Sequence, residues 1–368
     1  MAKIHQIEAI PIAIELRQPL HLASEIITKA QNLIVKITDS DGIIGWGEAA
    51  SAPTMTGETL PGMVEAVKRL IAPALANALI DETRTASATL SSMTGNPGAR
   101  AAVDVALHDI YGKRAGKPLH ELFGVKRHGF LQQIQMLDAH SAEKSLKRAD
   151  ALANEGFTHF KVKVGQSDPA EEAAFVDELR ALLGENAHLS ADANMAWDVA
   201  AARMFLTASQ ASGLVYLEQP LADGDISGMA QLSATSSLPL CLDEGIHAVS
   251  DIEAYDAEGA AKGVGLKLLK LGGFSGTLDA EATARRCGWQ TTYASKIAET
   301  SLGAAATAHA ACLSADVSWG VSLTQHYLRE DIALVPLSSS NGIAQVPHEP
   351  GLGVEPNLEK LARVRLDH

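Results

Sequence analysis

The chain is poor in cysteine. Its 368 residues include three cysteines, Cys241, Cys287 and Cys312, an odd number with no CxxC pair. A disulfide framework needs paired cysteines, and a structural zinc site usually needs clustered ones, so the sequence argues against both. With 46% apolar residues, the chain can bury a sizeable hydrophobic core. Its length allows two or three domains, or one large α/β barrel with an addition.

An excess of basic charge and a long apolar segment are also absent. The formal net charge is −14, and an acidic chain repels nucleic acid and anionic lipid, so we expect neither as a partner. No uncharged apolar run reaches the roughly 18 residues that span a membrane. The segment MAKIHQIEAIPIAIEL lacks the apolar core and cleavage site of a signal peptide. The expectation is a soluble cytoplasmic protein.

The sequence pattern changes near residue 130. Before it, two strand-like runs at 33–38 and 42–48 flank a Ser-Asp-Gly hairpin signal, and helical stretches follow. After it, short apolar runs alternate with helical stretches up to about residue 325. Such alternation implies parallel βαβ units, and this many of them favour a closed barrel over an open sheet. The Pro- and Gly-rich tail is predicted to be irregular chain packed against the body.

Charged residues lie at the ends of five successive predicted strands, each one βα unit after the last. The carboxyl ends of barrel strands converge on one face, where barrel enzymes carry their chemistry. Each charge alone is explained as a turn residue, a helix cap or an exposed side chain. Charged residues at five successive strand ends are not explained in these ways, because half-buried charge is costly unless it is paired or bound to metal. The strands are FKVKVG with Lys161 and Lys163, LSADAN with Asp192, VYLEQP with Glu218, CLDEG with Asp243 and Glu244, and VGLKLLK with Lys267 and Lys270.

Three of these residues form an oxygen-only ligand set. Asp192, Glu218 and Asp243 come from adjacent strands. Hard oxygen ligands suit Mg²⁺ or Mn²⁺ and leave coordination positions for substrate and water. No histidine ends these three strands, which disfavours zinc. The sequence therefore predicts a Mg²⁺ site, with Mn²⁺ possible, at the mouth of the barrel.

The stretch FKVKVG, residues 160–165, places two like charges on one side of a strand. Lys161 and Lys163 alternate with apolar residues, as in a half-buried strand. In isolation, an exposed strand face is the simpler interpretation. Beside three carboxylates, the pair instead indicates a site that holds anions. A neighbouring cation also lowers the pKa of a lysine, so that one lysine can act as a base near neutral pH.

The reaction that fits these groups is removal of a proton from the carbon next to a carboxylate. The product is an enediolate with added negative charge on its oxygens. A divalent cation stabilises that charge electrostatically.

Taken together, FKVKVG, SADAN, LEQP, LDEG and LKLLKLGG resemble the barrel motifs of the enolase superfamily. The Lys-x-Lys pair with a later lysine resembles the muconate-lactonizing subgroup. GIIGWGEA and ARAAVDVALHDIYGKRAGKPLHELFG are similar to the family's capping domain. The resemblance implies an α/β fold: a modified TIM barrel of (β/α)7β type with an α+β capping domain formed by the N-terminal part and the C-terminal tail. The expected division is 1–125 for the capping domain, 126–325 for the barrel and 326–368 for the returning segment.

The resemblance also implies roles for the charged residues, with Asp192, Glu218 and Asp243 as Mg²⁺ ligands. Enolase-superfamily sites pair a lysine or histidine base with this metal. A homo-oligomer is implied as well.

The lysines divide into two groups in this family pattern. Lys163 is the expected acid/base on one face of the substrate, and Lys161 helps to neutralise the substrate carboxylate. Lys267 serves the opposite face as the partner acid/base or as a cation. Lys270 is its rival, but Lys267 lies five residues before the Gly-Gly pair at 272–273, as the family's catalytic lysine does. Asn194 and Glu244 are expected to support these groups.

Specificity in this subgroup comes mainly from capping-domain loops and from the ends of strands seven and eight. The loop candidates here are 21–28 and 49–59. At strand seven the chain reads YASKIAETSLG, with Ser295, Lys296 and Glu299 as substrate candidates. AETSLGAAATAHA and VSWGVSL are similar to the same region of muconate cycloisomerases. Lys296 departs from that pattern and either contacts an anion or points away.

The favoured reaction is cycloisomerisation of a muconate-like dicarboxylic acid. Racemisation or epimerisation of an N-acyl amino acid, dipeptide or proline derivative, and syn-dehydration of a hydroxy acid, use the same residues. VSWGVSLTQHYLRED has no Asp-x-Asp pair for a dipeptide ammonium, and the mandelate-racemase His–Asp base pair is missing. His247 and His326 are therefore predicted to be ordinary surface or packing residues. The rival from another class is a barrel that binds a small acid without converting it.

Overall fold

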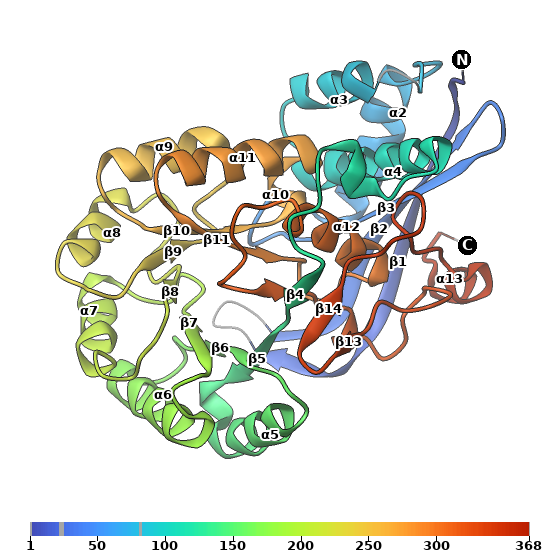
Figure 1. Cartoon of the computed structure of the whole chain (residues 1–368). Coiled ribbons are helices and arrows are strands. Elements are labelled where there is room, and N and C mark those ends of the chain that lie inside the picture. The colour runs from blue at the N-terminus through green and yellow to red at the C-terminus, as the bar shows by residue number, and fades with distance from the viewer. Residues whose placement is uncertain (1, 22–25, 81–82, 368) are drawn as a thin grey trace.

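A parallel eight-stranded sheet curls into a barrel that forms the body of the molecule (Figure 1). The computed structural model describes residues 2–21, 26–80 and 83–367. The sheet runs in chain order from β5 to β12, and Gln133 bridges Val321 where its first and last strands meet. Its strands are β5 (Ile134–Asp138), β6 (His159–Lys163), β7 (His188–Asp192), β8 (Leu217–Glu218), β9 (Leu240–Leu242), β10 (Gly263–Leu266), β11 (Gln290–Ala294) and β12 (Val321–Ser322).

Helices follow the first seven strands and cover the outside of the barrel (Figure 1). Many begin at a side chain that caps free backbone N–H groups: Asp168, for example, accepts from Ala170 N and precedes a proline at the first helical position. The predicted (β/α)7β barrel is therefore confirmed. The helices are α5 (Ala142–Asn154), α6 (Pro169–Leu183), α7 (Val199–Ala208), α8 (Ile226–Ser233), α9 (Val249–Ala257), the pair α10 (Leu268–Leu271) and α11 (Phe274–Arg286), and α12 (Ser301–Ala311).

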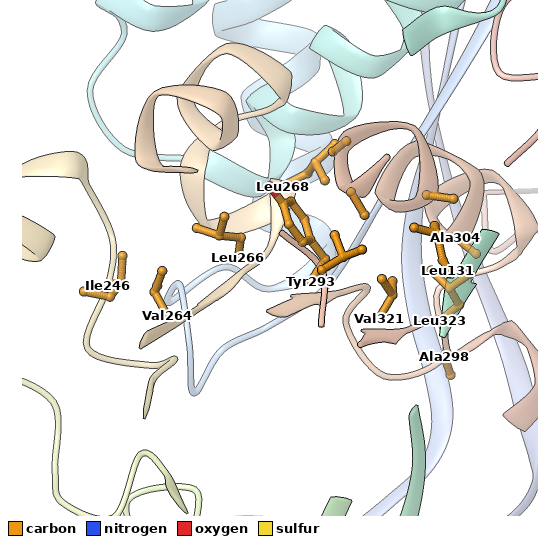
Figure 2. Packing of buried hydrophobic residues seen from close by; sticks show 14 of the residues in the cluster. Leu131, Ile246, Val264, Leu266, Leu268, Tyr293, Ala298, Ala304, Val321 and Leu323 are labelled. Carbon is orange, nitrogen blue, oxygen red and sulfur yellow. The ribbon is translucent and has the colours of Figure 1, made fainter. Parts of the chain in front are cut away.

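The main hydrophobic core lies between the strands and these helices. Figure 2 shows Val264 and Leu266 of β10, Tyr293 of β11 and Val321 of β12 within it. Leu266 pairs with Tyr293 and Tyr293 with Val321, so the three side chains share the helix-covered face of the sheet. All are fully buried. Truncating a leucine in such a place typically costs about 2–5 kcal/mol, so this packing holds the strand ends in position.

A second, antiparallel sheet forms the cap. Its strands are β1 (Ile4–His21), β2 (Ile26–Asp39) and β3 (Ile44–Ala50). Helices pack on it: α1 (Leu60–Ala66), a π-helical turn (Val67–Ile71), α2 (Ala72–Ala74), α3 (Thr83–Ser92) and α4 (Pro97–Ala115). The hairpin predicted from Ser-Asp-Gly is present; β2 is longer than expected, and β3 is shifted by two residues from the predicted run. β1 was not predicted, and it pairs along most of β2.

Two glycines of the motif GIIGWGEA set the distance between β3 and α4. A Cβ on Gly45 would lie 2.1 Å from the carbonyl oxygen of Ala106. A Cβ on Gly47 would lie 2.0 Å from the carbonyl oxygen of Ala102. Since no side chain fits there, the glycines allow the helix backbone to rest directly on the strand.

The C-terminal segment is more ordered than its composition predicted. Strands β13 (Ser339–Ser340) and β14 (Ile343–Gln345) form a small sheet with β4 (Phe130–Gln132), and α13 (Leu358–Val364) follows. Leu366 N donates to the Pro11 carbonyl of β1 at 3.0 Å, which returns the segment to the cap. The expectation of irregular chain was wrong here, because strands of two or three residues depend on a distant partner.

No helix in the described part of the chain is long and apolar enough to cross a membrane.

Candidate active site

The carboxyl ends of the barrel strands surround a small cavity of about 50 Å³. From the cap, Thr54 and Met55 of the candidate loop 49–59 reach the same cavity. In the other candidate loop, residues 22–25 lie outside the described residues. All of the site residues predicted from the sequence except Lys270 and Glu299 line this cavity: Lys161, Lys163, Asp192, Asn194, Glu218, Asp243, Glu244, Lys267, Ser295 and Lys296.

Strand β6 places Lys161 and Lys163 on the cavity side, as alternation predicted. The Lys161 Nζ lies 2.5 Å from Glu218 Oε2, and the Lys163 Nζ lies 2.5 Å from Asp192 Oδ2. Lys163 also donates to Asn194 Oδ1 at 3.0 Å. The two ammonium groups share one face because each has its own carboxylate from the next strands.

Asp243 holds the two later lysines. Strand β10 ends at Leu266, earlier than VGLKLLK predicted, and Lys267 precedes the short helix α10. Lys267 Nζ contacts Asp243 Oδ2, and Lys270 Nζ lies 2.8 Å from Asp243 Oδ1. Lys267 lines the cavity, whereas Lys270 is fully buried and does not. The geometry therefore separates the two: Lys267 is available to a bound molecule, and Lys270 holds Asp243.

The carboxylates of the site respond differently to burial. Burial would raise the pKa of Asp243, but Lys267 and Lys270 hold it well below its usual value. Burial would also raise the pKa of Asp192, but Lys163 and Lys161 lower it. Glu218 behaves in the opposite way. Burial, with the charges of Asp192 and Asp243, outweighs Lys161 and raises its pKa to about 7.

The same ion pairs raise lysine pKa values in the site. Burial opposes the charged form of Lys161, but Glu218 and other anions hold its pKa well above the usual range. Lys267 is raised in the same way, mainly by Asp243. The lowered pKa that the sequence predicts for one lysine of the FKVKVG pair is therefore not found at Lys161 in this arrangement. Lys267 can act as a base only if another cation takes over the carboxylate of Asp243.

The donor set fits a hard divalent cation. Within the described ranges, no three Asp, Glu, His or Cys side chains are grouped as ligands of one ion, and each of the three candidate carboxylates faces a lysine. Yet these are buried oxygen donors crowded enough to raise the pKa of Glu218. Nearby, Glu244 Oε2 is buried without a hydrogen-bond partner among the described residues. Asp192, Glu218 and Asp243 could hold Mg²⁺ in exchange for their lysines.

Supporting residues were only partly foreseen. Asn194 Nδ2 donates to Glu244 Oε1 at 2.9 Å, which ties the end of β7 to the end of β9. Gln219 was not predicted, although it stands beside Glu218 in LEQP. Its Oε1 accepts from Asp243 N at 2.9 Å and Gly245 N at 3.1 Å, and its φ is 36°. A non-glycine residue in the left-handed region costs on the order of 1 kcal/mol, and such strain gathers at functional sites.

Strands β11 and β12 are joined at the cavity by a hydroxyl network that was not predicted. Thr324 Oγ1 donates to the Lys296 carbonyl at 2.7 Å and accepts from Ala298 N at 3.1 Å. It also lies 3.2 Å from Ser295 Oγ. Lys296, whose direction the sequence left open, lines the cavity.

Glu299 lies at the joint between barrel and cap, outside the cavity lining. Its Oε1 accepts from Ala50 N at 3.3 Å. Its neighbour Glu48, on β3, accepts from Gly303 N and from both N–H and hydroxyl of Thr300 at the start of α12. Burial raises the pKa of Glu299 to about 8, with Glu48 as the next contribution, and burial raises the pKa of Glu48 to about 7.

The two histidines named from the sequence lie away from the cavity lining. His247 Nε2 lies 2.8 Å from Asp223 Oδ2 at the surface. The ring of His326 packs against that of Tyr327, and the two ring centroids lie 4.0 Å apart. Both positions agree with the surface and packing roles expected for them.

Comparisons with known proteins agree with this architecture. Residues 144–361 match the family model described as enolase C-terminal domain-like. Residues 6–124 match the N-terminal domain model of mandelate racemase and muconate lactonizing enzyme. Together the two matches cover most of the capping sheet and the barrel strands from β6 to β12.

Individual relatives align over nearly their whole length. The chain is 29% identical to the L-Ala-D/L-Glu epimerase of Bacillus subtilis (strain 168), over 96% of both chains. It is also 29% identical to muconate cycloisomerase 1 of Rhodococcus opacus, over 97% of this chain and 96% of that protein. Among solved structures, the muconate lactonizing enzyme from Pseudomonas fluorescens complexed with muconolactone matches with a TM-score of 0.95 at 29% identity, covering 99% of this chain and all of that chain.

Proposed function

The chain belongs to the mandelate racemase and muconate lactonizing enzyme family of the enolase superfamily, and from this premise we propose that it is an isomerase acting on small carboxylates. Its chemical step is transfer of a proton at the carbon next to the substrate carboxylate. The observation that carries the proposal is the placement of two lysines from different strand ends, Lys163 and Lys267, in one cavity.

Each lysine has a distinct task in this proposal. Lys163 removes or returns the proton on one side of the substrate, and Lys267 does so, or acts as a cation, on the other. Lys161 neutralises the substrate carboxylate. Proton transfer by a positioned side chain contributes typically about 10²–10⁴-fold in rate.

Asp192, Glu218 and Asp243 are the proposed Mg²⁺ ligands, with Mn²⁺ as a substitute. When bound, the metal supplies positive charge beside the substrate carboxylate, where negative charge increases as the proton leaves. The raised pKa of Glu218 supports this assignment, because burial and crowded carboxylates there favour neutralisation. The lysines are then released from their ion pairs for the chemical step.

Cycloisomerisation of a muconate-like dicarboxylic acid is our first choice of reaction. The full-length match to a muconate lactonizing enzyme supports it, with Lys296 as an added cation in the cavity. Racemisation or epimerisation of an N-acyl amino acid, dipeptide or proline derivative is the alternative, since an epimerase is equally similar in sequence. Syn-dehydration of a hydroxy acid uses the same lysines. A cytoplasmic location and a homo-oligomer complete the proposal.

The test is NMR in D₂O with Mg²⁺, using cis,cis-muconate, N-acyl and N-succinyl amino acids, dipeptides, hydroxyprolines, betaines and hydroxy acids. A converted compound identifies the reaction, and deuterium at the α-carbon identifies the shared step. Lys163→Ala and Lys267→Ala are expected to lose about 10²–10⁴-fold in rate. If the substrate is an amino acid that the enzyme racemises, each lysine variant should block α-hydrogen exchange from one of the two enantiomers.

A matched control is Lys262→Ala. Lys262 is exposed and precedes the other end of the strand that leads to Lys267, so its loss should leave the rate unchanged. Lysine variants that convert substrate at the wild-type rate would contradict the assignment. Acids that bind with Mg²⁺ but never exchange would favour the rival binding barrel.

A further inference from the structure

A second, larger cavity of about 970 Å³ adjoins the reaction cavity. Met136 and Lys163 line both, so the two spaces meet at the proposed base. Its walls come from the end of β1, from β5 and α5, and from the turn Gln325–Tyr327. Figure 1 shows the end of the capping sheet reaching the barrel on the side of β5 and α5.

The wall of this second cavity is strongly cationic in an acidic protein. The whole chain carries a formal charge of −14, yet Arg17, Lys144 and Arg148 all line the space, with Asp138 as the acid among the described lining residues. Asp138 Oδ1 accepts from His140 N at 3.0 Å. The local potential of such a cluster draws anions toward the cavity.

Among the described residues, no carboxylate neutralises these three cations. No ion pair joins Arg17, Lys144 or Arg148 to an acidic side chain within the described part of the chain. Arg17 Nε donates to the Leu328 carbonyl at 2.8 Å, which orients its guanidinium. Arg148 lies over the ring of Tyr327, with its central carbon 5.7 Å from the ring centroid. The two guanidinium groups are therefore positioned by neutral partners and keep their charge for a ligand.

Uncharged groups complete the second cavity. Leu20, Met136 and Leu137 provide apolar surface in the cavity that the cations and Lys163 also line. Burial, and then the charges of Arg148 and Arg17, lowers the pKa of His326 to about 4, so its ring is neutral at neutral pH. Its Nε2 has no hydrogen-bond partner among the described residues. An anion on a short carbon chain suits this mixture of walls.

We propose that Arg17 and Arg148, with Lys144, bind a second anionic group of the substrate, at the end of a chain that extends from the reacting carboxylate. This rests on the proposed function and narrows its substrate class to dianions. Arginine holds a carboxylate through two parallel hydrogen bonds, so the subsite selects for a terminal carboxylate over a methyl group.

Calorimetric titration with two matched probes tests the subsite. N-succinyl-L-alanine and N-butanoyl-L-alanine have acyl chains of equal length, ending in a carboxylate and a methyl group. In the presence of Mg²⁺, the wild-type protein should bind the succinyl probe about tenfold or more tightly, the scale of one charge-assisted contact. Arg17→Gln and Arg148→Gln should each reduce that preference, and the double variant should reduce it further.

Lys147→Gln is the matched control on the same helix. Lys147 pairs with Glu143 at 2.7 Å and does not line the cavity, so its loss should leave the preference unchanged. Because both probes are measured on one protein, a general loss of folding affects them together and leaves no selective change. Equal affinity of the wild-type protein for both probes, no binding of either, or an unchanged preference in the double variant would overturn the subsite.

Deuterium exchange separates this proposal from the proposed function. If the preference follows the arginines but no probe or panel compound exchanges its α-hydrogen, the subsite holds and the catalytic proposal fails. If the compounds exchange without any preference that depends on the arginines, the catalytic proposal holds and the subsite fails.

Discussion

Two groups of buried carboxylates in this molecule are stabilised in different ways. At the barrel mouth, Asp192, Glu218 and Asp243 face lysine side chains. At the joint between cap and barrel, Glu48 instead accepts from backbone N–H groups, a hydroxyl and the amide of Asn32. Side-chain ammonium groups can move away when another cation arrives, whereas the start of a helix cannot. The first group is suited to exchange of partners, and the second to holding two parts of the protein together.

Replacing a carboxylate by its amide in each group should separate these roles, and Asp243→Asn should have the largest effect. It removes a proposed metal ligand and leaves Lys267 and Lys270 without their shared anion. Loss of one member of a buried pair costs about 3–5 kcal/mol of stability. Mg²⁺ affinity should fall by more than the 10–100-fold typical of a supporting residue. Urea unfolding and Mg²⁺ titration measure the two effects, and an unchanged Mg²⁺ affinity would contradict the ligand assignment.

Glu48→Gln should have a smaller and purely structural effect. The amide keeps one acceptor oxygen but turns an NH₂ group toward donors such as Gly303 N. A buried donor without an acceptor costs about 1–3 kcal/mol, so the free energy of unfolding should fall by that amount. Mg²⁺ affinity of the folded protein should not change. If Glu48→Gln loses Mg²⁺ binding but not stability, Glu48 takes part in the metal site and its purely structural role is wrong.

The joint should also make stability depend on pH. The pKa of Glu299, raised to about 8 by burial and Glu48, lies above its value in the unfolded chain, so the folded state binds more protons between about pH 5 and 8. Its contribution to stability is therefore present at low pH and is lost as pH rises through that range. One proton corresponds to about 1.4 kcal/mol per pH unit. Glu299→Gln should reduce the slope by about this amount in urea unfolding at several pH values, and an unchanged slope would contradict the shift.

Asp331 and Lys296 also act on this joint, since Asp331 raises the pKa of Glu48 and Lys296 lowers that of Glu299. Other raised carboxyl groups, such as Asp109 at about 6, contribute to the slope of the wild-type protein. Because these other groups are present in both proteins, the difference in slope between wild type and Glu299→Gln reports the contribution of Glu299.

Much of the site was predictable because it depends on a local and repeated pattern. A strand period of two places Lys161 and Lys163 together, and the βα repeat brings Asp192, Glu218 and Asp243 to one face. What was missed depends on contacts between distant parts of the chain. β1 and β14 are defined by their partners, and the bond from Gln219 to Asp243 appears only when two strands lie side by side. Lys267 was placed correctly at the mouth, although the chain turns into a helix there instead of continuing the strand.

Two glycines of β3, which lie against α4, limit how the cap can move relative to the barrel. Gly45 and Gly47 fix that helix against the cap, while its Asp104 accepts from Phe274 N at 2.8 Å at the start of α11. The same helix also packs against α10, which begins directly after Lys267. A hinge motion of the whole cap would therefore pull on the segment that carries Lys267, the proposed partner acid/base. These contacts join cap and barrel into one frame at the mouth of the cavity.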